Sequence, residues 1–512
     1  MSTSAQSPQE IEPIDAVQAV LSEAGLHAGR LREVLRLLAS GPHPLQDLVR
    51  RTGVPRRTVQ DLLAACGGDV RSSPDGFALE PAAEPRYRER FEPAAGTGAD
   101  ETRALELLGS FVATGPRPST ALDHVSATPD TVLRRAVWLR DTFDLRGARV
   151  LCLGDHDLTS TAVALLAPEA EVLVLDLDER VLAHIDAVSA EHGLGIGTLH
   201  ADLRFGIPPE VDGWADLVFT DPPYTPEGAG LFAARGAGCL SGPGSRLLVA
   251  YGFSPRTPAL GQKVQQELLR MGLVFTAILP DFHSYLGAQA IGSTSDLYVC
   301  QPTAQTRKLA LRSAAGIYTH GPQSVEAAGT EDSADFRSGI VGLVGEPVEQ
   351  LRDPGWSRPI GSRPDSTPVF DLRADPGPWL LRMLLACHCP RVAFAVDNNH
   401  PDVADEAGQR GLSELVGPKF ALRFHRSTPD SRHAVVLAEE VTAPSAVRDV
   451  LQRAHGKLGN VWREALIAHT AEGLTKRAAR DRVQQAAQHP ADLQRRLIDL
   501  PRHRMPAALR FP

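Results

Sequence analysis

The central part of the chain places an acidic side chain after each of four apolar runs. These runs end as "LGDHD", "LVLD", "LHAD" and "VFTD". Apolar runs that alternate with helical stretches are typical of parallel strands, whose carboxyl ends meet at one edge of a sheet and bind ligands there. We therefore expect the acids to share one ligand site. They are Asp155, Asp176, Asp202 and Asp221.

The first three runs fit a nucleoside site. Gly154 allows a tight backbone turn against a ligand, and Asp176 follows about 20 residues later, where it can accept both ribose hydroxyls. Asp202 is expected beside an adenine amino group. The region lacks G-x-G-x-x-G, and Asp155 and Asp157 would repel a pyrophosphate but attract a sulfonium, which favours an S-adenosylmethionine-type fold. The expected cofactor-binding residues are Gly154, Asp155, Asp176, Leu177, Asp202, Leu203 and Asp221.

The loop "TDPPYTPEG" predicts alkylation of an amino nitrogen. The acid and backbone carbonyls of such a loop accept hydrogen bonds from an amino group, and Tyr224 can stack on a base or contact an ammonium. Aliphatic amines are mostly protonated at neutral pH, so a carboxylate must accept a proton. An aliphatic amine and an adenine both fit this pattern. The expected substrate-binding residues are His156, Pro222, Tyr224, Glu227 and Asp281.

The surrounding sequence divides into five segments. Residues 1–28 form a polar, mobile tail, and residues 29–95 show three helical patterns and two short strands, as in a winged helix. Residues 96–302 alternate strands and helices, which predicts a doubly wound sheet with helices on both faces. Residues 303–366 are expected to be a linker with a short ordered piece at "GIYTHG", and residues 367–512 to be a further α/β domain.

The predicted winged helix has two interpretations. Its third helix carries Arg56 and Arg57, which could contact DNA. Dimerisation or a lid function is favoured instead, because basic residues are not clustered here and the whole chain is acidic.

Composition favours a cytoplasmic enzyme. The chain has 512 residues, a net charge of -9, and 43% hydrophobic and 22% charged residues, which argues against broad nucleic-acid binding. The six cysteines lack a disulfide or zinc spacing, so neither disulfides nor a metal is expected. We find neither a signal pattern at the N-terminus nor an apolar run that approaches a membrane span.

Five motifs together resemble the branched-chain polyamine synthases, also called N4-bis(aminopropyl)spermidine synthases. They are "LGDHDLTS", "LDLDERVL", "ADLRFGIP", "TDPPYTPEG" and "GLFAARG", and the resemblance covers roughly residues 31–302. It implies an aminopropyltransferase that uses decarboxylated S-adenosylmethionine, adds aminopropyl groups to the internal nitrogen of spermidine and releases methylthioadenosine.

The resemblance also implies roles for individual residues. The expected catalytic residues are Asp157 as base, Asp155 assisting it, and Asp221. Tyr224 and Glu227 would line the amine pocket. Gly154, Asp176, Asp202 and Asp221 would hold the nucleoside. The family has a third acid where this chain has His156, which reduces the negative charge beside the amine or supplies a titratable partner. A solvated loop histidine is the other interpretation.

Three alternatives remain open from the residues. Intact S-adenosylmethionine could donate a methyl or a 3-amino-3-carboxypropyl group, provided that a cation or amide binds the methionine carboxylate. A DNA or RNA amino-methyltransferase is disfavoured, because no strongly basic groove is visible. A transcriptional regulator would combine the winged helix with a ligand-sensing nucleoside fold. For the enzyme, the expected partners are a small cationic amine and a second copy in a homodimer.

Overall fold

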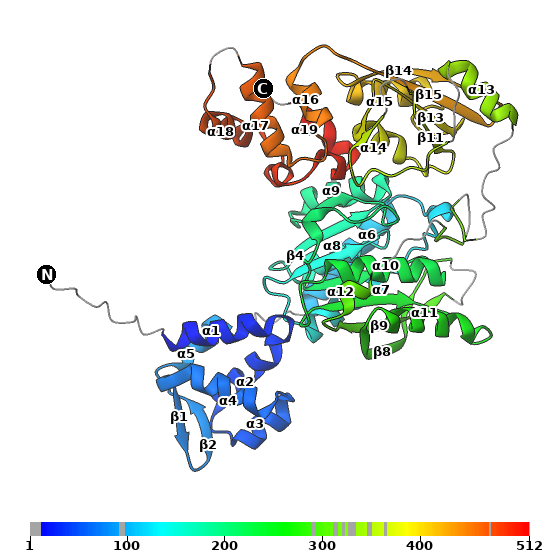
Figure 1. The fold of residues 1–512 in the computed structure, drawn as a ribbon. Helices are drawn as coiled ribbons and strands as arrows, with labels where there is room; N and C mark the ends of the chain where they lie inside the picture. The colour runs from blue at the N-terminus through cyan, green and yellow to red at the C-terminus, as the bar shows by residue number, and fades with distance from the viewer. Residues whose placement is uncertain are drawn as a thin grey trace.

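The computed structural model describes residues 12–91, 98–287, 293–310, 316–319, 323–325, 334–345, 351–362, 366–470 and 473–510. The N-terminal helices lie at one end of the molecule, a seven-stranded sheet lies in the middle, and the C-terminal elements lie at the other end (Figure 1). None of the described helices combines the length and apolar character needed to cross a membrane.

The N-terminal elements form a small helical unit with a hairpin. Gly53 ends one helix in the left-handed conformation, and the turn at residues 74–75 joins the two strands. Apolar faces of the helices pack around Leu38, Val59 and Leu62. The helix at residues 13–24 also buries apolar side chains in this core, so the prediction of a mobile tail up to residue 28 is wrong for this part. The elements are α1 (Pro13–Ala24), α2 (Ala28–Ser40), α3 (Leu45–Thr52), α4 (Arg56–Cys66), β1 (Val70–Ser73), β2 (Gly76–Leu79) and α5 (Glu84–Phe91).

The central region is an α/β fold built on a mixed sheet. Its strand order is β5-β4-β3-β6-β7-β9-β8. The first five of these strands are parallel, and β9 and β8 are antiparallel additions at the far edge. The strands are β3 (Arg149–Leu153), β4 (Glu171–Asp176), β5 (Gly197–His200), β6 (Leu217–Thr220), β7 (Arg246–Tyr251), β8 (Leu273–Ser284) and β9 (Thr294–Pro302).

Helices cover both faces of this sheet, as the alternating pattern predicts. Along β3, Val150 and Cys152 point into one apolar core, whereas Leu151 and Leu153 point into the other. A strand that is buried on both faces reads as a continuous apolar run. The helices are α6 (Gly98–Thr114), α7 (Pro129–Thr142), α8 (Thr159–Leu166), α9 (Glu179–His192), α10 (Pro226–Cys239) and α11 (Pro258–Arg270).

The order of the strands reverses at β3. After β3 the chain builds β4 and β5 on one side, and it then crosses to β6 and β7 on the other side. In open α/β sheets, ligands bind beyond the carboxyl ends of the strands at such a switch point.

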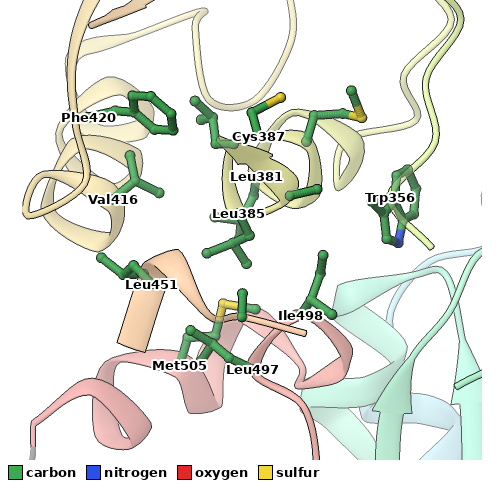
Figure 2. Close-up of a cluster of buried hydrophobic side chains, with 14 of the residues drawn as sticks. Trp356, Leu381, Leu385, Cys387, Val416, Phe420, Leu451, Leu497, Ile498 and Met505 are labelled. Atoms are coloured by element: carbon green, nitrogen blue, oxygen red, sulfur yellow. The ribbon is translucent and has the colours of Figure 1, made fainter. Parts of the chain in front are cut away.

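The C-terminal region has its own sheet, in the order β11-β13-β15-β14, and its own apolar core (Figure 2). α13 also packs on this sheet, through Phe336 and Ile340, so the core begins before residue 367, inside the expected linker. The elements are α12 (Thr306–Leu309), α13 (Ala334–Val344), β10 (Ile360–Gly361), β11 (Val369–Leu372), α14 (Trp379–Ala386), β12 (Cys387–His388), β13 (Arg391–Asp397), α15 (Glu406–Val416), β14 (Phe420–His425), β15 (His433–Glu440), α16 (Ala446–Gln452), α17 (Leu458–His469), α18 (Lys476–Ala486) and α19 (Met505–Leu509).

Charged side chains join the C-terminal region to one edge of the central sheet. Arg382 is fully buried and donates to Glu179 at the start of α9. Arg495 donates to the carbonyl of Thr198 on β5 at 3.0 Å. The C-terminal region therefore covers the edge of the sheet that β5 and α9 form. Asp202 follows β5, and Asp176 ends the neighbouring strand β4.

Candidate active site

A cavity of about 640 Å³ opens at the carboxyl ends of β3, β4, β5 and β6. Asp123, Asp157, Asp176, Asp202 and Asp221 line it, whereas none of its described lining residues is a lysine or an arginine. Such a cavity attracts cations and disfavours anions.

The turn after β3 brings the backbone close to the cavity. Gly154 has a φ of 67°, and a Cβ at this position would lie 3.3 Å from Cε1 of Phe232. Both the positive φ and the close approach favour glycine, as expected from the sequence.

Asp176 is held by backbone groups and keeps room for a ligand. Its Oδ2 accepts from the amide of Asp155 at 2.8 Å, and its Oδ1 accepts from the amide of Asp178 at 2.7 Å. A carboxylate has about four acceptor positions in total, so Asp176 can also accept hydrogen bonds from a ligand in the cavity. Burial raises the pKa of Asp176 to about 7.

Asp202 differs from Asp176 because protein donors fill its carboxylate. Oδ1 accepts from the backbone amide and Nε of Arg204, at 3.0 and 2.8 Å. Oδ2 accepts from Nη2 of Arg204 at 2.5 Å and from the indole Nε1 of Trp379 at 2.9 Å. These bonds occupy the roughly four acceptor positions of a carboxylate. Asp202 lines the cavity but has no spare acceptor for an adenine amino group, in contrast to its expected role.

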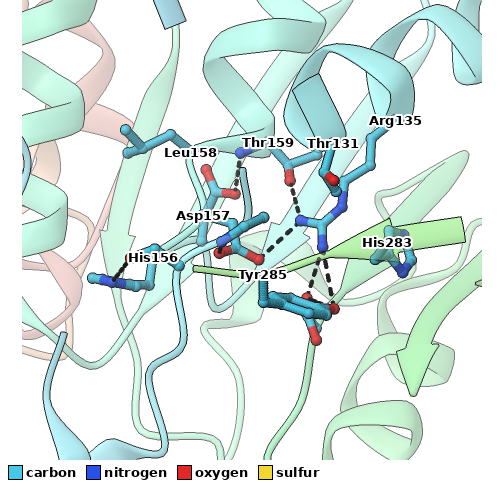
Figure 3. A network of polar contacts seen from close by, with 12 residues as sticks. Thr131, Arg135, His156, Asp157, Leu158, Thr159, His283 and Tyr285 are labelled. Atoms are coloured by element: carbon cyan, nitrogen blue, oxygen red, sulfur yellow. Dashed lines mark hydrogen bonds and ion pairs between the residues drawn. The ribbon is translucent and has the colours of Figure 1, made fainter. Parts of the chain in front are cut away.

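A buried arginine joins the two acids at the centre of the sheet (Figure 3). Nη1 of Arg135, on α7, donates to Asp157 Oδ2 at 2.9 Å and to the hydroxyl of Thr159 at 2.9 Å. Its Nη2 donates to Asp221 Oδ2 at 2.7 Å. The backbone amide of Ala127 donates to the other oxygen of Asp157 at 2.6 Å. One guanidinium thus fixes both carboxylates and offsets their mutual repulsion.

Two tyrosines complete the surroundings of Asp221. The Tyr285 hydroxyl donates to Oδ2 at 2.7 Å, and the Tyr224 hydroxyl lies 2.8 Å from that of Tyr285 and 3.2 Å from Oδ1. Burial raises the pKa of Asp221 to about 7, although the neighbouring Arg135 opposes that shift. Burial also raises the pKa of both tyrosines, so they act as neutral donors.

A pair of neutral imidazoles lines the cavity beside Asp157. The rings of His124 and His156 are stacked, with centroids 4.3 Å apart and planes 15° apart. Burial lowers the pKa of His124 to about 4 and also lowers the pKa of His156. His156 Nε2 lies 3.1 Å from the hydroxyl of Ser126. His156 is therefore neither a solvated loop residue nor a cation at neutral pH.

The structure brings most of the expected site residues together. The cavity is lined by Gly154, His156, Asp157, Asp176, Leu177, Asp202, Leu203, Asp221, Pro222 and Tyr224. Asp155, Glu227 and Asp281 are outside this lining. Asp155 is buried and accepts from the amides of Thr159 and Ser160 at the start of α8, so it holds that helix rather than an amine. Glu227 and Asp281 are exposed, and Asp281 bonds with Thr294 on β9.

Four important residues were not predicted. The sequence pattern could have indicated Arg135, because it lies on the buried face of α7 with Val132 and Ala136, and a charged residue on a buried face needs a partner. Tyr285, His124 and Tyr318 also line the cavity. They come from irregular segments far along the chain, where no period or motif marks them.

Comparisons with known proteins point to one family. Residues 104–311 match the model of the branched-chain polyamine synthase A C-terminal domain. An uncharacterized protein of Methanocaldococcus jannaschii is 32% identical over 238 residues, which are 46% of this chain and 59% of that protein. The N(4)-bis(aminopropyl)spermidine synthase of Thermococcus kodakarensis is 33% identical over 186 residues, which are 36% of this chain and 52% of that protein.

A solved structure is also similar. It is a branched-chain polyamine synthase mutein of Thermus thermophilus in complex with N4-aminopropylspermidine and 5'-methylthioadenosine. The sequences are 26% identical, the match covers 59% of this chain and 96% of that one, and the TM-score is 0.38.

Proposed function

We propose that this chain, whose residues 104–311 match the model of the branched-chain polyamine synthase A C-terminal domain, transfers an aminopropyl group to an amine nitrogen of a polyamine such as spermidine. The donor would be decarboxylated S-adenosylmethionine and the second product methylthioadenosine. The observation that carries the proposal is the cavity lining, with its five aspartates and, among the described lining residues, no lysine or arginine.

This lining supports a decarboxylated donor. Intact S-adenosylmethionine carries a carboxylate, which would lie among acids without a cationic side chain to bind it. The decarboxylated donor lacks this carboxylate but keeps the ammonium group and the sulfonium, both of which the acids attract. The same argument weighs against a methyl or 3-amino-3-carboxypropyl transferase.

The strand order supports a division of the cavity into two halves, one for each substrate. Asp176, at the end of β4, would accept the ribose hydroxyls on one side of the switch point. Asp157 and Asp221, at the ends of β3 and β6, would receive the amine on the other side. Among the described residues, Asp157 accepts one hydrogen bond on each oxygen, and Asp221 Oδ1 accepts one from the Tyr224 hydroxyl. Both carboxylates therefore retain acceptor positions for N–H groups.

The reaction is a displacement at carbon. The lone pair of the amine forms the new N–C bond while the C–S bond breaks, and its electrons convert the sulfonium to the neutral thioether of methylthioadenosine. The nitrogen loses one proton, which a carboxylate of the Arg135-linked pair accepts and passes to solvent. Asp221 is suited to this step because its pKa is about 7, near the working pH.

The other parts of the chain are assigned as follows. We interpret residues 29–95 as a winged helix that supports dimer contacts rather than catalysis, and residues 367–512 as a further α/β domain. The six unpaired cysteines fit a reducing cytoplasm.

Two substitutions test the roles of the acids. Asp157→Asn and Asp221→Asn should each lower the rate of aminopropyl transfer by at least a hundredfold, in the range typical for loss of a general base, while methylthioadenosine still binds. Asp141→Asn, on the exposed side of α7, is the matched control. Transfer at the wild-type rate in both site variants would refute the assignment.

A further inference from the structure

A short segment beyond the region matched by the family model lies against the active site. Ile317, Tyr318 and Thr319 line the cavity. The hydroxyl of Thr225 donates to the carbonyl of Ile317 at 2.7 Å, and the amide of Thr319 donates to Asp123 at 2.7 Å. A Cβ on Gly228 would lie 2.7 Å from the Ile317 carbonyl oxygen, so the segment makes a close contact with the start of α10.

Tyr318 lines this cavity and carries a phenol hydroxyl. The side chain is buried, with 5% exposed, and no described residue forms a hydrogen bond with its hydroxyl. Its electrostatic neighbours are Arg204, Asp202, Asp176 and Asp123, which places it in the nucleoside half of the cavity. Burial raises the pKa of the phenol, so the hydroxyl stays protonated and can donate.

Arg204 supports the ring of Tyr318. Its guanidinium carbon lies 5.5 Å from the centroid of Tyr318 and 4.9 Å from that of Trp379. The guanidinium is therefore in contact with an aromatic ring of the C-terminal region and with the ring that lines the cavity. Its ion pair with Asp202, which Trp379 also contacts, fixes its position.

The C-terminal core in turn fixes Trp379. Asp375 accepts the amides of Trp379 and Leu380 at 3.0 and 2.8 Å, which sets the start of α14. Phe205 packs against Trp379 and Trp356, with centroids 5.3 and 4.5 Å away. Figure 2 shows Trp356 at the side of the C-terminal core that borders the central region. Contacts thus run without a break from this core to Tyr318.

We propose that Tyr318 binds the nucleoside of the donor, and that Trp379 is a positioning residue that holds Tyr318 through Arg204. The C-terminal region would then complete the donor site on the covered edge of the sheet. This inference rests on the proposed function, because it takes a nucleoside as the ligand of the β4–β5 half. It also explains why Asp202 needs no free acceptor, since the aromatic ring and hydroxyl of Tyr318 would contact the base instead.

The test is the affinity of the full-length protein for methylthioadenosine, measured by calorimetry. Base–aromatic stacking predicts that Tyr318→Ala weakens binding about fivefold or more. Tyr318→Phe keeps the ring and should therefore lose less affinity for methylthioadenosine than Tyr318→Ala. Trp379→Ala should also weaken binding, whereas Trp379→Phe, which keeps a ring over Arg204, should lie closer to wild type. The Michaelis constant for the amine should stay unchanged in all four variants.

Trp462→Phe is the matched control, because Trp462 also donates its indole N–H at 2.9 Å but to Ala508, inside the C-terminal core. The affinity of the Trp462→Phe variant for methylthioadenosine should equal that of wild type. Wild-type affinity in Tyr318→Ala would overturn the inference and leave the proposed function standing. Nucleoside binding without aminopropyl transfer would refute the proposed function alone, and a wild-type protein that binds no methylthioadenosine would overturn both.

Discussion

Arg135 donates to Asp221 at 2.7 Å from a side chain that is almost wholly buried. The same guanidinium holds Asp157, so the two acids expected to meet the amine are parts of one ion-pair network (Figure 3). A single positive charge between two carboxylates leaves a net charge of about -1 when both are ionised. The site can therefore attract an ammonium without forcing two unpaired acids together.

Arg135→Gln should destabilise the protein strongly. It leaves two buried carboxylates without their cation, and breaking a buried ion pair costs about 3–5 kcal/mol in free energy of unfolding. Urea denaturation would measure the loss. Arg134→Gln is the control, because Arg134 donates to the carbonyl of Phe282 in an exposed position. A loss below about 1 kcal/mol, the usual effect of a surface substitution, would mean that the network is not a main support of the site.

His156→Asp should lower the Michaelis constant for a polyamine about fivefold or more. The neutral ring of His156 lines the cavity beside Asp157, and a carboxylate there would add a charge close to the bound ammonium. Steady-state kinetics with spermidine would measure it. His156→Asn controls for loss of the stacking with His124 without adding charge. Equal Michaelis constants in the two variants would show that this position does not contact a cation.

Asp155 should make stability depend on pH. Burial raises its pKa to about 7 in the folded protein, against 3.8 in the unfolded chain. Between these values the folded state binds the proton and the unfolded state does not. The contribution of Asp155 to stability is therefore fully present below about pH 4 and is lost as the pH rises to 7.

Asp155→Asn removes this titration. From pH 5 to pH 8 the variant should gain about 2–3 kcal/mol in free energy of unfolding relative to wild type, at about 1.4 kcal/mol per pH unit below 7. Denaturation curves of both proteins at the two pH values would show it. If the difference in free energy of unfolding between the variant and wild type were the same at pH 5 and pH 8, it would contradict the buried, protonated state of Asp155.

The sequence predicted the elements that carry the site because their patterns are local. Thr128, a residue type that caps helices, accepts from the amide of Thr131 at the start of α7, and Gly53 ends α3 in the left-handed conformation. The apolar runs became β3, β4, β5 and β6, and their acids meet at one edge because parallel strands share it.

The roles of individual acids were harder to predict, because partners far along the chain decide them. Asp176 and Asp202 follow equivalent strands, yet Trp379, 177 residues after Asp202, fills the last acceptor position of Asp202 only. Asp155 and Asp157 are two residues apart. Asp155 accepts from an amide at the start of α8, whereas Asp157 forms an ion pair with Arg135. No local pattern distinguishes such pairs.

The central claim is aminopropyl transfer, and mass spectrometry of the products tests it most directly. Purified protein would be incubated with spermidine and either decarboxylated or intact S-adenosylmethionine. The account predicts methylthioadenosine and a mass gain of one or two aminopropyl units with the decarboxylated donor only. Adenosylhomocysteine and a methyl gain with the intact donor would contradict it.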